Sequence, residues 1–592
     1  MIDRVNEWGV RHWRLIVLLF WISYAIFAIV NRWSAIQGFA LGDTDDNLRL
    51  AQVRALLGGQ GWYDLTQHRF DPVHGAADIH WSRLVDLPLA GLILLFRPLL
   101  GGLEAERWAV TIAPLLALLP MLVGLALVTR RLVDPRAVPL VLLTMLFAGS
   151  TTGMVLPLRL DHHGWQLAFL ALGLAGLADP RRVRGGITLG LASAASLAIG
   201  LELLIYLALM GGATVLFWVA DRDERGRLMA YAASVSGGTT AAYLLFASEA
   251  NRAALCDALS PVWLGDALAG GAVMAALALV RADKWTMRLA LAVAAGAALI
   301  AVHAIASPHC LERLEGVSPE ATELWLSHVR EARPIYRHGA RIMTMMLALP
   351  LAGLVGWALL AWRARTDDEL LRRTLGVALP PVTALFLLFW QTRTGPAAQM
   401  MSVPAAAAMV FILAPMAFRA PSAWLRVPGT VVVVLVGLGA LVPLIAGYIP
   451  GKPKTAAQKA VDLANRSCPS LRAMAPVARQ PQGLVFSFVD LGPRLIAVTH
   501  HDAIAGPYHR NDRAIADVMK AFRGDEAQAR RIIVDEYRSD YLLICPNMST
   551  ATIFRAETPK GFYMQLNAGR APDWLEPIDL GSKSPFKMWR VR

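Results

Sequence analysis

The stretch RLDHHGWQLAF, residues 159–169, joins the end of one long apolar run to the start of the next. The run before it is VLLTMLFAGSTTGMVLPL and the run after it is WQLAFLALGLAGLA, and each approaches the length that crosses a bilayer. Asp161, His162 and His163 therefore lie at the mouth of a membrane helix. Ionisable side chains at such a position are functional candidates, because the membrane disfavours their charge.

The whole chain has the composition of a polytopic membrane protein. It has 592 residues, of which 56% are hydrophobic and 17% charged, and its mean hydropathy is +0.46. The net charge of +13 comes from short Lys and Arg clusters between apolar runs. Such clusters are typical of topology signals and contacts with anionic membrane lipids, so we expect no nucleic-acid partner. The first apolar run follows MIDRVNEWGVRHWR without a cleavage site, which predicts a retained first span.

Hydropathy predicts about thirteen transmembrane helices. Several windows are shorter than a usual span, so the pair around Glu202 can also be one bent or re-entrant unit. The windows are 14–30, 107–129, 137–157, 165–179, 186–200, 203–220, 228–247, 262–280, 288–306, 341–362, 374–391, 398–418 and 427–448.

Basic connecting segments set the predicted orientation. Arginine-rich links such as DPRRVR and DRDERGR occur at every second crossing, which indicates the cytoplasmic side. The segment 84–103 would invert this order if it crossed, and it carries charges and prolines, so we predict an interfacial or re-entrant helix there. The segments 31–106, 158–164 and 307–340 then share the outer side. The expected location is a bacterial-type inner (plasma) membrane, with the candidate site on the periplasmic side.

The composition changes after the last apolar window. Residues 1–450 form the expected transmembrane domain, and residues 451–592 form an expected small extracytoplasmic α/β domain. GLVFSFVDLG and RLIAVTH have the pattern of strands, whereas NDRAIADVMKAF and EAQARRIIVDEYR have the pattern of helices. On the outer side, Cys256 can pair with Cys310 and Cys468 with Cys545. Four buried free thiols are the alternative.

A first group of candidate ligands follows the first span. Asp43, Asp45 and Asp46 place three carboxylates within four residues, and these repel one another unless a cation lies among them. The alternative is structural, because acidic residues in a first helical turn also cap the turn and favour the helix dipole.

The second group is Asp161, His162 and His163. In an extended turn, the Asp-x-His spacing puts Asp161 and His163 on one side, where they can chelate one divalent ion. Mixed carboxylate and imidazole ligands suit Mn²⁺ or Mg²⁺ better than a structural zinc site. The alternative is a hydrogen-bonded helix end at the membrane surface.

A third group lies in ELWLSHVREARPIYRHG, residues 323–339. Glu331 stands there among three arginines that can bind a phosphate or form a salt-bridged surface. Arg393, at the outer end of a later span, can also bind phosphate. The three arginines are Arg330, Arg333 and Arg337.

These residues resemble the catalytic subunit family of oligosaccharyltransferases, within the GT-C superfamily of membrane glycosyltransferases. Asp161-His162-His163 is similar to the archaeal form of the family's second outer-loop motif. Asp45, followed by Arg54 at the spacing of bacterial members, is the best match to the first-loop metal aspartate. Glu331 looks like the glutamate of the flexible fifth outer loop. The resemblance covers residues 1–450 in architecture, and it implies thirteen spans and a C-terminal α/β domain.

One family signature is missing. The Trp-Trp-Asp motif, which recognises the Ser or Thr of an asparagine sequon, has no counterpart after residue 450. The polar stretch THHDAIAGPYHRND, residues 499–512, stands there instead, and we expect Tyr508, His509 and Arg510 to contact the acceptor. His500, His501 and His509 can also form a metal site, although hydrogen-bonded histidines are commoner.

The resemblance implies transfer of a sugar or oligosaccharide from a polyprenyl phosphate or pyrophosphate donor to a glycan, lipid or protein acceptor. Asp45, Asp161 and His163 would hold Mn²⁺ or Mg²⁺, with Asp45 or Glu331 as the general base. Arg393 or the three arginines near Glu331 would bind the donor phosphates. The alternative function is a transporter or flippase for a lipid-linked or anionic substrate, which would favour mid-helix charges and internal symmetry. A catalytically inactive scaffold protein is the third possible function.

Overall fold

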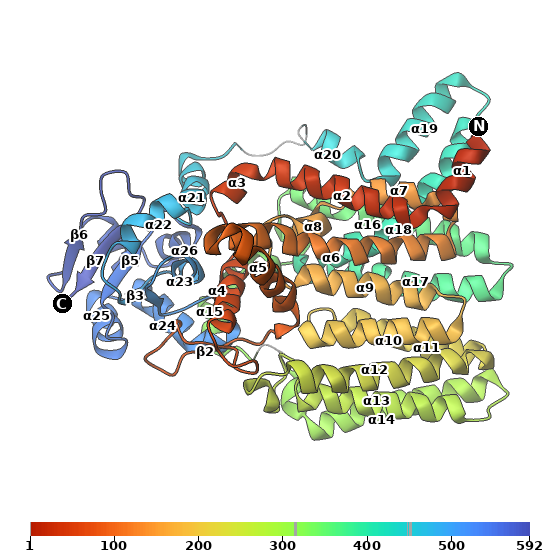
Figure 1. Ribbon diagram of the computed structural model, residues 1–592, viewed down its shortest axis with the longest axis horizontal. Coiled ribbons are helices and arrows are strands. Elements are labelled where there is room, and N and C mark those ends of the chain that lie inside the picture. The colour runs from red at the N-terminus through yellow and green to blue at the C-terminus, as the bar shows by residue number, and fades with distance from the viewer. Residues whose placement is uncertain (1, 313–315, 447, 449–452) are drawn as a thin grey trace.

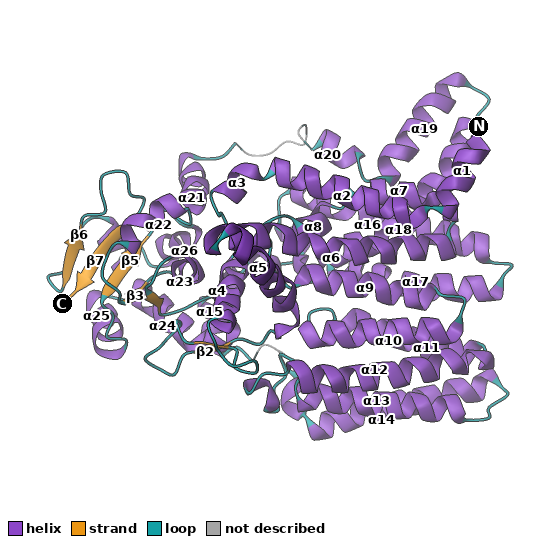
Figure 2. Cartoon of the chain, viewed as in Figure 1, coloured by secondary structure: helices purple, strands orange, loops and turns teal. Residues whose placement is uncertain are grey.

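A computed structural model describes residues 2–312, 316–446, 448 and 453–592. A bundle of long helices forms one part of the molecule, and a smaller domain with a β-sheet covers one end of it (Figure 1). We call this end of the bundle the site end. Figure 2 shows that the long strands all lie in the smaller domain.

The thirteen apolar windows all coincide with helices. Seven helices in the described residues are long and apolar enough to cross a membrane, or eight if one bent pair is a single span. The chain is therefore a multi-pass membrane protein, whereas the count of thirteen crossings is not confirmed. The helices of the bundle are α2 (Trp13–Asn31), α6 (Gly102–Leu132), α7 (Val138–Met145), α9 (His163–Ala178), α10 (Arg182–Ile199), α11 (Leu204–Ala220), α12 (Arg225–Phe246), α13 (Pro261–Leu279), α14 (Trp285–Ala306), α16 (Ala340–Ala364), α17 (Asp368–Leu387), α18 (Gly395–Phe418) and α19 (Ala423–Gly437).

Two windows are interrupted. The window 137–157 contains α7 and α8 (Gly149–Thr152), which belong to a helix pair bent by 71°. The last window breaks at Gly439, which has a positive φ of 74°, before α20 (Leu441–Ile445). Around Glu202 the chain forms two helices, α10 and α11, joined by residues 200–203.

The segment predicted to be interfacial is a separate short helix, α5 (Asp86–Leu100). It packs on α6 and α4 (Thr44–Leu57) and is too short for the spanning test that α6 passes. Its outward face carries Leu94, Leu95 and Leu99, which are 54%, 62% and 80% exposed. An apolar face on a short helix at the site end fits a position along the membrane surface.

Small residues bring the bundle helices together. A Cβ at Gly356 of α16 would lie 1.8 Å from the Ala405 carbonyl oxygen of α18. Such close backbone approach is how helices pack in lipid, where burial of apolar side chains gives little driving force.

The C-terminal domain has a five-stranded mixed sheet in the order β4-β3-β5-β7-β6. β3 pairs in parallel with β4 and β5, whereas β7 is antiparallel to β5 and β6. The strands are β3 (Leu484–Phe486), β4 (Asp502–Ala503), β5 (Tyr541–Ile544), β6 (Leu575–Ile578) and β7 (Lys587–Val591). The helices around them are α21 (Ala456–Ser467), α22 (Leu471–Ala478), α23 (Gly492–Val498), α24 (Asp512–Arg523), α25 (Glu526–Arg530), α26 (Ser549–Glu557) and α27 (Phe562–Asn567).

One strand prediction in this domain is wrong. RLIAVTH lies mainly in α23, because Gly492-Pro493 starts a helix that buries Leu495 and Ile496 on its way to β4. GLVFSFVDLG contains β3, and the two helix-like runs are helical. Both expected cysteine pairs, Cys256–Cys310 and Cys468–Cys545, form disulfides.

The loop after the first span is joined to the C-terminal domain. It contains α3 (Trp33–Gln37), α4 and the hairpin β1 (Thr66–Gln67) and β2 (Ala77–Asp78). Phe70 forms a β-bridge with Ala503, and Arg69 pairs with Asp502 and donates to carbonyls after α23. Two further short helices lie outside the bundle and the C-terminal domain. They are α1 (Ile2–Arg11), at the start of the chain, and α15 (Pro319–Leu324), which packs on α24.

Arg494 is the buried centre of this junction. Its side chain is 2% exposed and donates to the carbonyls of Pro469 and Phe39 and to the side chain of Asn47, at 2.7–3.0 Å. One guanidinium thus links the C-terminal domain to the loop that carries the first carboxylate cluster.

We predict that Arg494→Met destabilises this junction by about 2–4 kcal/mol, because three buried acceptors lose their donor. Thermal unfolding of the detergent-solubilised chain and limited proteolysis measure the effect. The control is Arg479→Met, an exposed arginine at the end of α22. Equal protease sensitivity of the two variants would contradict the prediction.

Candidate active site

Two sequence-distant carboxylate groups meet at the site end of the bundle. The turn before α9 carries Asp161, and its backbone amides at Leu160 and Asp161 donate to Asp46 Oδ1 at 2.7 and 3.1 Å. Asp46 lies in the first turn of α4. The structure therefore brings the first and second predicted ligand groups together.

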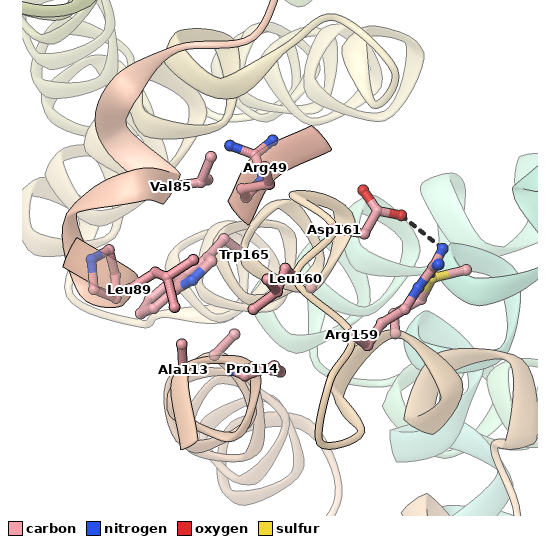
Figure 3. Close-up of a pocket in the computed structure, with 13 residues that line it drawn as sticks. Arg49, Val85, Leu89, Ala113, Pro114, Arg159, Leu160, Asp161 and Trp165 are labelled. Atoms are coloured by element: carbon pink, nitrogen blue, oxygen red, sulfur yellow. Dashed lines mark hydrogen bonds and ion pairs between the residues drawn. The ribbon is translucent and has the colours of Figure 1, made fainter. Parts of the chain in front are cut away.

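Arg159 is the positive charge shared by these groups. Its guanidinium pairs with Asp43, lies 2.8 Å from Asp161 Oδ2 and lies 3.6 Å from Asp46 Oδ2. Figure 3 shows Arg159 and Asp161 facing each other across this turn. One arginine is thus shared by carboxylates of both groups.

The capping role expected for Asp45 and Asp46 falls partly on another residue. Asp43 is the N-cap of α4, and Asp46 closes a capping box with it by accepting from the Asp43 amide. Asp45 makes neither capping contact, so its carboxylate is available for another role.

Burial makes the charged forms of these carboxylates costly. It raises the pKa of Asp46 to about 7, against the opposing attraction of Arg159. Burial, and next the negative charges of Asp161 and Asp43, raise the pKa of Asp45 well above its ordinary value. A divalent cation would relieve this repulsion, which the charge of Arg159 does not cancel.

The turn itself presents converging ligand atoms. Asp161, His162 and His163 each have a carboxylate oxygen or ring nitrogen within 4.8 Å of the others. His163 Nδ1 lies 2.8 Å from both oxygens of Asp161. Mixed oxygen and nitrogen donors at this spacing fit Mn²⁺ or Mg²⁺.

A small cavity adjoins Asp161 on the side of α5. Its volume is about 20 Å³, and Figure 3 shows Arg49, Leu89 and Trp165 around it. Arg49 forms an ion pair with Asp86 at 2.7 Å and stacks on Trp81, with its guanidinium carbon 4.6 Å from the ring centre. This buried support fixes the position of α4 beside the carboxylates.

The third predicted group also reaches the site end. The turn at Glu331 is bound to the turn at Arg393, because Thr392 donates to the Glu331 carbonyl at 3.2 Å. The carboxylate of Glu331 lies close enough to act electrostatically on His163. Glu331 and Arg393 are exposed, as are Arg330, Arg333 and Arg337.

The three residues expected to contact an acceptor lie in different surroundings. Burial, and next the negative charges of Asp45 and Asp43, raise the pKa of Tyr508 well above its ordinary value. His509 and Arg510 instead pair with Asp257, at 2.6 and 2.7 Å. Tyr508 is thus the residue of the three that adjoins the carboxylates.

The C-terminal histidines do not gather into one metal site among the described residues. His500 and His501 donate to backbone carbonyls at Gln480 and Val477. His509 groups instead with His80 and Asp257.

Sequence reasoning missed several residues of the site. Arg159 was visible inside the RLDHHG stretch and could have been identified as the counter-charge of the aspartates. Glu202 interrupts an apolar region and accepts a hydrogen bond from His162. Asp257 and His80 gave no local signal, since each is recognised only by partners far away in the sequence.

Comparisons with known proteins give structural matches only. No family model matches the chain, and no curated protein matches it. An archaeal oligosaccharyltransferase, AglB from Archaeoglobus fulgidus, in complex with an inhibitory peptide and a dolichol-phosphate, has a TM-score of 0.68 at 15% identity. The match covers 96% of this chain and 73% of that one.

Two further structures of the Archaeoglobus fulgidus oligosaccharyltransferase agree. The apo form has a TM-score of 0.67 at 16% identity over 91% of this chain and 70% of that one. A complex with Zn and sulfate has a TM-score of 0.59 at 15% identity over the same shares. The chain therefore has the fold of an archaeal oligosaccharyltransferase over most of its length.

Proposed function

We propose that this protein is a membrane glycosyltransferase that transfers a sugar or oligosaccharide from a polyprenyl phosphate or pyrophosphate donor. The observation that carries the proposal is the meeting of Asp45 and the Asp161–His163 turn at the covered end of a bundle with an oligosaccharyltransferase fold. The Archaeoglobus fulgidus enzyme with this fold was solved with a dolichol-phosphate. Dolichol-phosphate is a polyprenyl phosphate, the class of lipid that we propose for the donor.

Asp45, Asp161 and His163 are the proposed ligands of Mn²⁺ or Mg²⁺. The convergence of the turn's donor atoms and the repulsion that Asp45 experiences from Asp161 and Asp43 support this set. The related Archaeoglobus enzyme was solved with zinc, which supports a divalent cation of some kind. When bound, the cation neutralises negative charge on the phosphate leaving group.

The protein's own groups bind and orient the two substrates. Asp45 or Glu331 accepts the proton of the acceptor as its oxygen or nitrogen attacks the anomeric carbon. Arg393, with Arg330 and Arg333 of the neighbouring turn, binds the donor phosphate by charge-assisted hydrogen bonds. Tyr508, beside Asp45, is the proposed acceptor contact from the C-terminal domain. A lipid-linked donor explains why these groups lie at the end of a membrane bundle.

We expect Asp161→Ala to lose Mn²⁺ binding and to lower sugar transfer at least about a thousandfold, because the charge of the leaving group is no longer offset. Calorimetry with Mn²⁺ and a transfer assay with a polyprenyl-linked donor measure the two effects. Asp573→Asn, at an exposed position of the C-terminal domain, is the control. Transfer that survives in Asp161→Ala, or chelator-resistant transfer, would refute the proposed role of the cation.

Arg393→Ala should lower kcat/KM for the donor by about 10–100-fold, the loss expected for a charge-assisted hydrogen bond. Mn²⁺ affinity should stay unchanged, and Arg393→Lys should recover part of the activity. Arg419→Ala removes an exposed arginine at the other end of α18 and serves as the control. A proportional loss in both alanine variants would argue against phosphate binding by Arg393.

The proposed orientation puts the site end outside a bacterial-type inner membrane. Single cysteines at the exposed positions Arg225 and Asp573 test it, because Arg225 starts the bundle helix α12, next to the arginine-rich link predicted to be cytoplasmic, whereas Asp573 belongs to the C-terminal domain. An impermeant thiol reagent added to spheroplasts should label the cysteine at 573 and not the one at 225. The reverse pattern would invert the orientation.

A further inference from the structure

His162 lies between two carboxylates at the candidate site. Its Nε2 is 2.9 Å from Glu202 Oε1, and its Nδ1 is 3.0 Å from Asp161 Oδ1. His162 is 2% exposed and the side chain of Asp161 is buried as well, whereas Glu202 remains partly open to solvent. The three side chains come from the turn before α9 and from the link between α10 and α11.

The contact with Glu202 requires a proton on His162 Nε2. A carboxylate oxygen only accepts, so His162 Nε2 must donate to it. The geometry on the other side differs, since Nδ1 makes no hydrogen bond to any described residue although Asp161 is 3.0 Å away. In the neutral ring the lone pair is then on Nδ1, and a buried ring nitrogen without a hydrogen-bond partner, beside a proposed metal ligand, can bind a cation through it.

The distances within the turn support this reading. Two ligand atoms at right angles around a cation, each about 2.1 Å from it, are about 3 Å apart. Asp161 Oδ1 lies 3.0 Å from His162 Nδ1 and 2.8 Å from His163 Nδ1. Asp161 thus has the spacing of a neighbouring ligand to each histidine, and the ligand atoms of all three side chains lie within 4.8 Å of one another.

Glu202 is itself held in place. Its second carboxylate oxygen accepts from Gln166 Nε2 at 2.6 Å. The link between α10 and α11 has no room for a side chain at Gly200 beside this carboxylate, because a Cβ there would lie 2.3 Å from Glu202 Oε2. Trp81 packs against the His162 ring, with ring centres 5.2 Å apart. The histidine is therefore fixed both by its hydrogen bond and by the indole.

We propose that Glu202 is a positioning residue that holds the His162 ring with its Nδ1 lone pair in the cation site. His162 thereby becomes a ligand in addition to Asp161 and His163. The proposal rests on the proposed function, because it assumes that the turn binds a divalent cation. Histidine ligands commonly depend on such an outer carboxylate for their tautomer and orientation.

The first test compares Mn²⁺ affinities of the full chain in detergent, without any sugar substrate. Glu202→Gln keeps the shape of the side chain but has only one acceptor oxygen for its two donors, His162 and Gln166. We expect it to weaken Mn²⁺ binding about 10–100-fold, the usual effect of losing an outer partner of a metal-binding histidine. Glu249→Gln, an exposed position in the loop after α12, should bind as the wild type does.

A second pair of variants identifies the ring nitrogen. Asparagine places its side-chain oxygen where Nδ1 was, whereas glutamine places a polar atom where Nε2 was. His162→Asn should therefore keep more Mn²⁺ affinity than His162→Gln. Spin-echo spectra of bound Mn²⁺ should show nitrogen couplings from two imidazoles in the wild type and from one in His162→Gln. These comparisons remain decisive if Glu202→Gln fails to fold.

The outcomes separate this inference from the proposed function. Wild-type Mn²⁺ affinity in Glu202→Gln and His162→Gln, with loss in Asp161→Ala, would overturn the role of Glu202 and leave the cation site in place. Equal loss in the asparagine and glutamine variants would overturn the assignment of Nδ1. Wild-type affinity in Asp161→Ala would overturn the cation site itself and this inference with it.

Discussion

The charge balance around Arg159 is the constraint on which the site end depends. Four carboxylates, from Asp43, Asp45, Asp46 and Asp161, lie near a single guanidinium, and burial disfavours the charged forms of Asp45 and Asp46. The arrangement is tolerable because backbone amides of the turn donate to Asp46 and because Arg159 bridges the two groups. The repulsion among the carboxylates, which together with burial raises the pKa of Asp45, makes the site receptive to a divalent cation.

The two carboxylate groups are more than a hundred residues apart in the sequence, and the fold must hold them next to each other. α4 supplies the first group, and its position depends on Arg49, which pairs with Asp86 beneath Trp81. From the other side, Arg494 joins both α4, at Asn47, and the segment before it, at Phe39, to the C-terminal domain. The C-terminal domain therefore acts as a structural clamp on the loop that carries Asp45, whatever part its surface takes in acceptor binding.

The sequence predicted the local features of the fold well and its long-range contacts poorly. The apolar windows coincide with helices because hydropathy is a property of each segment alone. RLIAVTH was misjudged because a buried seven-residue helix and a buried strand have the same apolar composition, and only Gly492-Pro493 favoured the helix. Of the site, the turn at Asp161 and the cluster at Asp45 could be identified, since ionisable residues beside apolar runs are conspicuous. Glu202 could not be assigned a role, because its meaning comes from His162, forty residues away in the chain.

In the polar stretch 499–512, contacts within the fold limit which side chains can bind an acceptor. His509 and Arg510 are held by Asp257, which directly follows Cys256 of the Cys256–Cys310 disulfide. Arg510 also donates to Asn251, whose side chain in turn donates to the His80 carbonyl. These contacts tie the C-terminal domain to two loops of the bundle at once.

To bind an acceptor, His509 or Arg510 would have to break a partly buried ion pair with Asp257, and breaking such a pair leaves a charge without its partner. Tyr508, held against Trp81 and the Asp45 cluster, needs no such exchange. Acceptor recognition in this chain is thus expected to run through the tyrosine, with the histidine and arginine fixing the loop that presents it.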